Sequence, residues 1–512
     1  MAQSGKITVF PKPGIYRGAT PQASVGRWYD MNLVRWRGGQ AQPVGGSASL
    51  PGAIGDAPGR DALTWHDNSG RRWAAMGTDN KLWVYNFETN SIRDITPDGV
   101  GSLEPPGARV GYGLADYGAD AYGTARDPGD IGPSDVSAIL GDMWSMDLYG
   151  EDLVFVPTQD GRLFQWVPNE AGDPATQVAN APGQNSGVFV TEERAIVLIG
   201  AGGNPRNIAW CDQEQPTVWD DQVDNLAGSK LLETEGRSLT SSKCSGGNLI
   251  FTDNDAHLFS YVGPPYAYGI NRIGANCGPC SRRAVAYAGD VVKWMGAQQF
   301  WQYSGAVTPM PSDVGDWMFS LLNRDMIGRV FAAPNPSFAE LWWYWPSEES
   351  TECNRYVAQT YGDSASPWII GMQTRTAADT RGSMLRPVLA GTDGKLYLHE
   401  FGWSENGASR VGTIYVETAD FMLDQETNKR FHVKQLIPDF VGPASRIGFR
   451  FFLWEQPDGP QWDTGVYPII DASGLVDAKF SCRGLRMRIE ALEDGPFALG
   501  RTRFDVREGG SR

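Results

Sequence analysis

Two cysteines that enclose Gly-Pro form the sharpest chemical motif of the chain. Cys277 and Cys280 lie in the stretch GANCGPCSRR, with the Cys-X-X-Cys spacing of dithiol–disulfide exchange. That chemistry requires a helix after the first cysteine, because the helix N-terminus lowers the pKa of the thiol. The residues that follow, SRRAVAYAGDVVKWMG, alternate as in a strand. The sequence therefore predicts that both cysteines pack in a connection between strands and do no redox chemistry.

Other reactive groups are scattered. A zinc ribbon needs a second cysteine pair, and Cys211, Cys244 and His257 are isolated in sequence. The segment HDNSGRRW at 66–73 is a degenerate form of the Asp-box turn of sialidase-like propellers, and none of the four histidines has a triad context. We expect no catalytic residue, no metal site, no cofactor and no enzymatic activity. A glycosidase stays unsupported rather than excluded, because a central propeller site gathers residues from many blades.

A recurring hairpin indicates the architecture that must position these residues. Each copy has a polar turn followed by a strand that starts with Leu or an aromatic residue, and the copies lie about one or two multiples of 40–50 residues apart. The copies are GTDNKLWVY (77–85), TQDGRLFQW (158–166), TDNDAHLFSY (252–261), GAQQFWQY (296–303) and GTDGKLYLHEF (391–401). Strand-like segments at 193–212 and 340–346 fill two gaps. This period predicts an all-β chain with a β-propeller of six or seven blades over residues 46–408.

Three segments depart from the repeat. Residues 97–135 fit no helix or strand period, and we expect a long inserted loop there, with Tyr112, Asp116, Tyr117, Asp120 and Tyr122 as candidate channel or tip residues. Residues 409–512 carry longer alternating strands and predict a C-terminal β-sandwich. The one expected helix lies within 313–325.

Charge is distributed unevenly along the chain. The formal net charge is −16, which argues against general nucleic-acid binding. Residues 1–45 are predicted to form a basic N-terminal arm and first strand, because residues 1–40 hold six basic residues against Asp30 alone. Such an arm is either solvated or docks on an acidic partner. The basic residues are Lys6, Lys12, Arg17, Arg27, Arg35 and Arg37.

Targeting signals are absent from the sequence pattern. The N-terminus has no apolar core of a signal peptide, and no apolar run is long enough to span a membrane. Six cysteines in 512 residues form no disulfide framework. We expect synthesis in a reducing cytoplasm.

Four landmarks occur in order along the chain: GRWYDMNLVRWRGGQAQPVGG (26–46), DMWSMDLYGEDLVF (142–155), GNPRNIAWCDQEQPTVWD (203–220) and GPFALGRTRFDVREGG (495–510). Together they resemble the tail nozzle (tail hub) or packaged-DNA stabilisation proteins of short-tailed bacteriophages. The resemblance spans most of the chain and implies no catalytic residues. It implies that the candidate subunit or adaptor contacts are Arg17, Arg27, Trp28, Arg35, Trp36 and Arg37.

The resemblance implies a structural virion protein. Such subunits form a homo-oligomeric, six-fold ring below the head-to-tail adaptor proteins, contact tail fibres or tip proteins, and pass double-stranded DNA without reading its sequence. The expected location is the phage tail, after assembly in the host cytoplasm. The acidic total charge agrees with a channel that repels phosphates. The alternatives are a tail-associated glycan-binding protein and a glycoside hydrolase acting on host surface polysaccharide.

Overall fold

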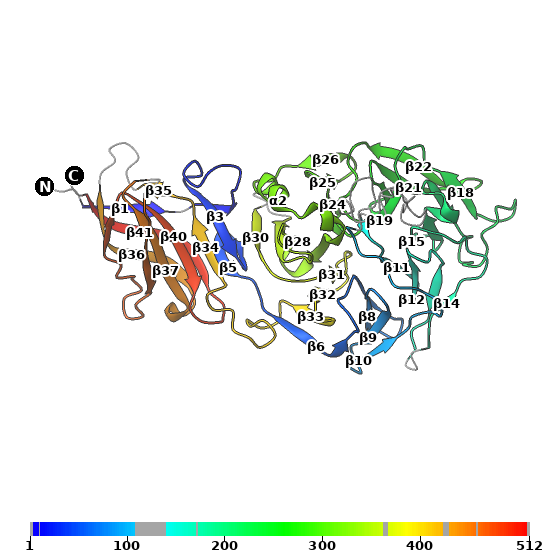
Figure 1. The fold of residues 1–512 in the computed structure, drawn as a ribbon, viewed down its shortest axis with the longest axis horizontal. Helices are drawn as coiled ribbons and strands as arrows, with labels where there is room; N and C mark the ends of the chain where they lie inside the picture. The colour runs from blue at the N-terminus through cyan, green and yellow to red at the C-terminus, as the bar shows by residue number, and fades with distance from the viewer. Residues whose placement is uncertain are drawn as a thin grey trace, which may run out of the picture.

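The computed structural model describes residues 4–9, 11–107, 140–169, 173–361, 367–422, 430–456 and 459–508. These residues form a β-propeller and a β-sandwich, which lie end to end along the longest axis of the molecule (Figure 1). The all-β prediction and its propeller-plus-sandwich architecture are confirmed.

The propeller has seven four-stranded antiparallel sheets in the described residues. The inner strand of each sheet contacts the inner strand of the next, and β31 of the last contacts β7 of the first, which closes the ring. Blade one comprises β7 (Asp61–His66), β8 (Arg72–Gly77), β9 (Leu82–Asn86) and β10 (Ser91–Asp94). Blade two comprises β11 (Trp144–Tyr149), β12 (Asp152–Pro157), β13 (Phe164–Trp166) and β14 (Thr176–Gln177). Blade three comprises β15 (Gly187–Val190), β16 (Ile196–Ile199), β17 (Asn207–Trp210) and β18 (Gly228–Leu231).

The remaining blades follow the same order. Blade four comprises β19 (Ser238–Cys244), β20 (Gly247–Thr252), β21 (Ala256–Gly263) and β22 (Ala267–Gly274). Blade five comprises β23 (Val285–Ala288), β24 (Val291–Met295), β25 (Phe300–Tyr303) and β26 (Val307–Met310). Blade six comprises β27 (Phe331–Asn335), β28 (Glu340–Trp345), β29 (Arg355–Thr360) and β30 (Trp368–Met372). Blade seven comprises β31 (Ala377–Ala378), β32 (Val388–Ala390), β33 (Lys395–His399) and β6 (Ser47–Ile54).

The recurring hairpins of the sequence occupy equivalent places. All five copies contain the third strand of a blade: β9, β13, β21, β25 and β33. The segments at 193–212 and 340–346 supply strands of blades three and six. The polar turn recurs because it reverses the chain between the buried second strand and the third strand of each blade.

The sandwich is built from both ends of the chain. Its six-stranded sheet has the order β39-β36-β41-β5-β4 with β1 beside β41, and its seven-stranded sheet has the order β2-β3-β34-β40-β37-β38 with β35 beside β40. The strands are β1 (Ser4–Val9), β2 (Lys12–Ile15), β3 (Arg27–Asn32), β4 (Val34–Arg37), β5 (Gln40–Pro43), β34 (Tyr415–Thr418), β35 (Phe421–Met422), β36 (Phe431–Val441), β37 (Ile447–Trp454), β38 (Trp462–Pro468), β39 (Phe480–Cys482), β40 (Gly484–Ala491) and β41 (Ala498–Glu508).

The N-terminal residues therefore differ from the arm expected over 1–45. Strands β1 to β5 complete the two sheets of the sandwich, and only then does the chain enter the propeller at β6. Strand β6 pairs with β33, so the first propeller strand closes the last blade. The physical reason is long-range strand pairing: β2 pairs with β3 and β4 with β5 locally, but β1, β3 and β5 join the sheets by pairing with strands more than 350 residues later.

Helical structure is sparse in the described residues. The expected helix is present as α2 (Gly315–Leu321), and the end of the predicted stretch, 324 and 325, begins a separate 3₁₀ turn, η2 (Arg324–Arg329). Shorter turns occur at η1 (Ala201–Gly203), η3 (Pro336–Phe338) and η4 (Ala444–Arg446). None of these helices is long and apolar enough to cross a membrane.

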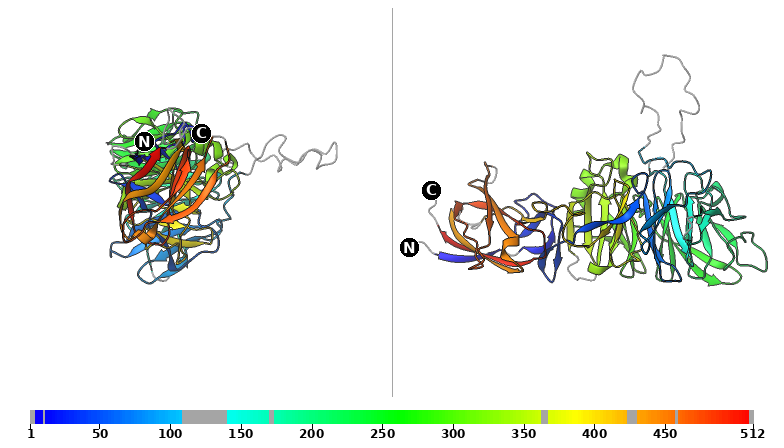
Figure 2. Two further views of the ribbon diagram at one scale, coloured as in Figure 1. Left: turned by 90° about the vertical axis from the view of Figure 1, so that its left-hand side faces the viewer. Right: turned by 90° about the horizontal axis from the view of Figure 1, so that it is seen from below.

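Further views show that the molecule has two distinct ends (Figure 2). Strands β1, β36 and β41 lie at the end that carries both chain termini, whereas β18 and β22 lie at the opposite end, beyond the propeller axis (Figure 1). One continuous apolar cluster joins the sandwich to blades five and six, so the two domains share a core at their junction.

Candidate functional site

The Cys-Gly-Pro-Cys segment joins blade four to blade five, between β22 and β23. Cys277 donates its backbone N–H to the carbonyl of Asn254 (2.9 Å), and its own carbonyl accepts a hydrogen bond from Trp294 Nε1 (2.6 Å). A Cβ on Gly278 would lie 2.2 Å from the carbonyl oxygen of Asp253. Glycine is therefore required here by close packing between backbones.

Burial makes both thiols poor nucleophiles. Cys277 and Cys280 are 1% and 5% exposed. Burial raises the pKa of Cys277 to about 11 and raises the pKa of Cys280 further. The next regular element is strand β23, so no helix N-terminus acts on either thiol. The expected packing role of the motif agrees with this geometry.

The segment HDNSGRRW forms the turn between β7 and β8. The buried carboxylate of Asp67 accepts hydrogen bonds from the backbone N–H groups of Ser69 and Arg71 (both 2.9 Å) and from Trp73 Nε1 (3.0 Å). Burial raises the pKa of Asp67, but these bonds and the Arg71 guanidinium outweigh burial and lower it. The carboxylate therefore holds the turn together.

The zinc possibility receives no support from the positions of its candidate ligands. Among the described residues, no three His, Cys, Asp or Glu side chains gather in a way that could hold a metal ion.

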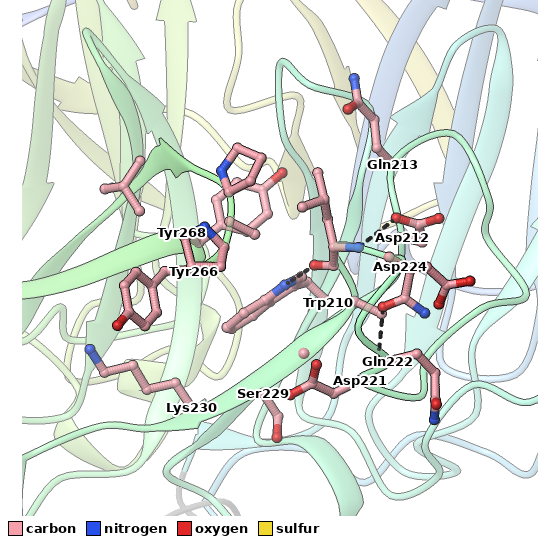
Figure 3. Close-up of a pocket in the computed structure, with 18 of the residues that line it drawn as sticks. Trp210, Asp212, Gln213, Asp221, Gln222, Asp224, Ser229, Lys230, Tyr266 and Tyr268 are labelled. Carbon is pink, nitrogen blue, oxygen red and sulfur yellow. Dashed lines mark hydrogen bonds between the residues drawn. The ribbon is translucent and has the colours of Figure 1, made fainter.

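A wide, open groove lies at the far end of the propeller. It lies between blades three and four and has a volume of about 1430 Å³. Trp210 of β17 forms its floor and donates a hydrogen bond from Nε1 to the carbonyl of Leu226 (2.8 Å) (Figure 3). The Trp210 ring meets the Tyr268 ring edge-on, with centroids 5.6 Å apart.

Acidic side chains line one side of this groove. Asp212 Oδ1 accepts a hydrogen bond from the Leu226 backbone N–H (2.8 Å), which fixes the loop between β17 and β18. That loop presents Asp221 and Asp224 beside the groove, across from Tyr266 and Lys230 (Figure 3). The four acidic groove residues, Asp212, Glu214, Asp221 and Asp224, outnumber the single basic one, Lys230.

Apolar side chains on the groove rim are unusually exposed. Val223 is fully exposed, and Val262 and Tyr266 are 57% and 79% exposed. Exposed apolar groups beside a charged rim are typical of surfaces that bind another macromolecule. The lining residues include no His, Cys or Arg, so the groove holds no nucleophile paired with a histidine base.

The candidate contact residues of the N-terminal segment are used within the chain. Trp28, Arg35 and Trp36 are buried. Arg27 forms an ion pair with Asp313 (2.7 Å), and Arg17 pairs with Asp30 (3.0 Å). The three buried side chains pack inside this chain in this conformation, and the prediction that these six positions contact another subunit or the adaptor stays a prediction.

Arg35 makes the densest of these contacts, at the junction of the two domains. Its Nε lies 2.9 Å from Glu340 Oε1, and its Nη1 lies 3.1 Å from Glu400 Oε2. Its guanidinium also stacks on the Phe338 ring at 3.7 Å. Glu340 belongs to blade six and Glu400 follows blade seven, so the acidic partner of the basic segment is this chain's own propeller. Arg37, by contrast, is exposed.

A basic surface lies on the six-stranded sheet of the sandwich, at the end opposite the groove. Arg503 and Arg507 of β41 alternate with buried residues and are exposed. Lys6 pairs with Asp505 in the strand register, so its side chain joins the same face, and Lys434 of β36 is exposed nearby. We call this the basic face: it holds Lys6, Lys434, Arg501, Arg503 and Arg507 against one acidic residue, Asp505.

Sequence reasoning missed both the basic face and the acidic groove. The alternation Arg501-Arg503-Arg507 was visible, but its neighbours Lys6 and Lys434 join it only through strand pairing. The predicted loop residues Tyr112, Asp116, Tyr117, Asp120 and Tyr122 lie outside the described residues.

Comparisons with known proteins find similar structures but no match in sequence. No protein-family model and no curated protein matches it in sequence. The WD40 domain of Pan2 from Neurospora crassa is similar over 70% of this chain and 94% of that domain, with 9% identity and a TM-score of 0.39. A Bacteroides fragilis protein described as exported is similar over 50% of this chain and 88% of its own, with 9% identity and a TM-score of 0.30. The seven-bladed architecture therefore rests on the strand pairing of the chain itself.

Proposed function

We propose that this chain is a structural subunit of a phage tail nozzle, which assembles into a ring that continues the DNA channel below the head-to-tail adaptor. The observation that carries the proposal is the opposite charge of the two ends of the molecule. The basic face lies at the sandwich end, and the acidic groove with its exposed apolar rim lies at the propeller end.

Two different, complementary surfaces on one chain favour head-to-tail association. When such a contact repeats, the assembly closes into a ring if the rotation between copies allows it. Groove residues Val223 and Tyr266 supply apolar area, and the charges fix orientation and speed the encounter. The order of landmarks that resembles nozzle proteins supports the same assembly.

The total charge supports the passage of DNA. Basic and acidic surfaces would neutralise each other in the contacts between copies, and a copy with a net charge of −16 leaves the ring strongly negative. A negative lumen repels the phosphate backbone, so the duplex slides without being held.

Glycan binding is the second candidate, and the groove is the observation that favours it. An exposed aromatic ring, Tyr266, beside Asp221 and Asp224 offers a stacking surface and hydrogen-bond acceptors for sugar hydroxyls. Retention of the chain on immobilised host polysaccharide, lost in Tyr266→Ala, would favour this candidate over the nozzle.

A charge-swap cycle tests the nozzle proposal. The double variant Arg503→Glu/Arg507→Glu and the double variant Asp221→Lys/Asp224→Lys should each weaken self-association by at least about ten-fold, because like charges then face each other. An equimolar mixture of the two should regain association. Lys479→Glu, an exposed site on the same domain, is the matched control and should associate normally. Unchanged association of both double variants would contradict the proposed contact.

A further inference from the structure

The inner strands of the propeller enclose a second, smaller cavity at its centre. It has a volume of about 520 Å³, within the range of pockets that hold small molecules. Residues of β7, β11, β15, β19 and β23 line it, together with the loop after β31. Hydroxyl groups are frequent in the lining: Thr64, Ser145, Thr240, Ser242, Thr380 and Ser383.

Two adjacent arginines, Arg282 and Arg283, line this cavity and are more than nine-tenths buried. They are 8% and 7% exposed. Arg282 Nη1 donates to the carbonyls of Ser186 (3.0 Å) and Leu239 (3.1 Å), whereas its Nε is buried without a partner among the described residues. Arg283 Nη2 donates to the Gly328 carbonyl (3.4 Å), and its Nη1 is likewise buried and unpartnered.

An acidic group of blade one completes the cluster without neutralising it. Asp61 accepts a hydrogen bond from the Ala62 N–H at Oδ1 (3.0 Å), and its Oδ2 is buried with no partner among the described residues. Burial raises the pKa of Asp61 to about 7, although the Arg283 charge acts against this. Near neutral pH this carboxyl therefore carries less than a full negative charge and does not fully neutralise Arg283.

Other charges of the cavity are already matched or lie near its opening. Arg381 pairs with Asp147 (2.9 Å), whereas Glu192 and Lys243 are exposed. Arg282 and Arg283 have no carboxylate within ion-pair distance in the described part of the chain. A buried guanidinium without an anionic partner is costly, because it loses its hydration and gains no opposing charge.

We propose that the central cavity is a binding site for a small oxyanion, the carboxylate or phosphate group of a hydroxylated solute, held by Arg282 and Arg283. The guanidinium groups of Arg282 and Arg283 supply the positive charge and the donors for the oxyanion, and the hydroxyl groups of the wall bind the rest of the solute. This site is separate from the groove and does not depend on the proposed nozzle function.

Thermal unfolding with two probes tests the site. Sodium glucuronate and sodium phosphate are titrated at neutral pH against sodium chloride of equal ionic strength. We expect at least one of the two probes to raise Tm by about 2 °C at roughly ten times its Kd, and the rise grows with the logarithm of concentration. The midpoint of the titration is taken as the probe concentration that gives half of this rise. A response to glucuronate alone identifies carboxylate recognition, and a response to phosphate alone identifies phosphate recognition.

Variants assign the response to the arginines. Arg282→Gln and Arg283→Gln should each shift the midpoint of the titration by at least about ten-fold, because each removes a charged donor. Arg194→Gln, an exposed arginine outside the cavity, should leave the midpoint unchanged. Should the glutamine variants not fold, Arg282→Lys keeps the charge, loses the Nε donor and should also shift the midpoint. The site is ruled out if neither probe exceeds chloride on the unaltered chain, or if the cavity variants respond as the unaltered chain does.

Discussion

Arg35 shows how one side chain joins the two domains of this molecule. It is 2% exposed and lies between the carboxylates of Glu340 and Glu400, which also accept hydrogen bonds from Trp342 Nε1 and from the Gly45 backbone N–H. Three of the four carboxylate oxygens that face Arg35 thus accept a hydrogen bond from a second donor, because Asn335 Nδ2 also donates to Glu400 Oε1. Within the N-terminal segment, the positive charge of Arg35 therefore stabilises the junction between the two domains.

Replacing Arg35 should therefore destabilise the chain strongly. Arg35→Met leaves two buried carboxylates without their cation, and the free energy of unfolding should fall by about 3–5 kcal/mol. Arg37→Met is the matched control, because Arg37 lies on the same strand and near the same Phe338 ring but is exposed. Its effect should stay within about 0.5 kcal/mol. Urea unfolding measures both, and equal losses would contradict the assigned role.

The cysteines should react only when the protein unfolds. All six are buried and free, and burial raises the pKa of Cys277 to about 11 and that of Cys244 to about 11. At neutral pH we expect a thiol reagent such as DTNB to label native protein much more slowly than urea-unfolded protein, in which all six should react. Rapid labelling of Cys277 in the native state, lost in Cys277→Ser, would restore the redox interpretation.

Asp61 should make stability depend on pH in an unusual direction for a carboxylate. Its pKa is raised from about 3.9 in the unfolded chain to about 7 in the fold. The stabilisation linked to this group is fully present below pH ~4 and is lost as pH rises to about 7. The free energy of unfolding, measured across this pH window, should decline as pH rises, and it should decline less in Asp61→Asn. Parallel curves for both proteins would contradict the shifted pKa.

At the scale of the element, the propeller could be predicted well from sequence. Its hairpins are local: the second and third strands of each blade are neighbours in the chain, so turn residues and alternation such as GTDNKLWVY reveal them directly. The prediction that Cys277 does no redox chemistry follows from the same local argument, because strand β23 rather than a helix comes after it.

The sandwich strands at the N-terminus could not be predicted in the same way. Strand β3 pairs with β34, and β1 pairs with β41, across almost the whole chain. Local patterns carry no information on such partners. The local pattern therefore indicates a basic arm rather than sandwich strands, and it gives no sign of the basic face, whose residues come together only through strand pairing.

Deletions at the N-terminus should separate these interpretations. Removing residues 1–40 takes away β1 to β4 and the first residue of β5, so the sandwich should lose its cooperative unfolding. Removing residues 1–10 takes away only β1, an edge strand that pairs with β41 alone, and should lower Tm by a few degrees at most. Calorimetry distinguishes the outcomes; a normal sandwich transition after removal of 1–40 would show that the segment is a detachable arm.

At the scale of the whole molecule, the chain is a rod with unlike ends. Both termini are tied into the sandwich by β1 and β41, and the propeller is closed by β6, so each domain is fastened by strands from distant parts of the sequence. The shared apolar junction holds the two domains as one body. The basic face and the acidic groove are thereby kept apart, where each can meet the opposite surface of another copy.

Direct imaging of the purified chain tests the ring most directly. Negative-stain electron microscopy at low ionic strength, where charge complementarity is least screened, should show closed rings of about six copies. The Arg503→Glu/Arg507→Glu variant, imaged under the same conditions, should form no rings. Single copies at every concentration, with no ring at low salt, would contradict the proposed nozzle subunit.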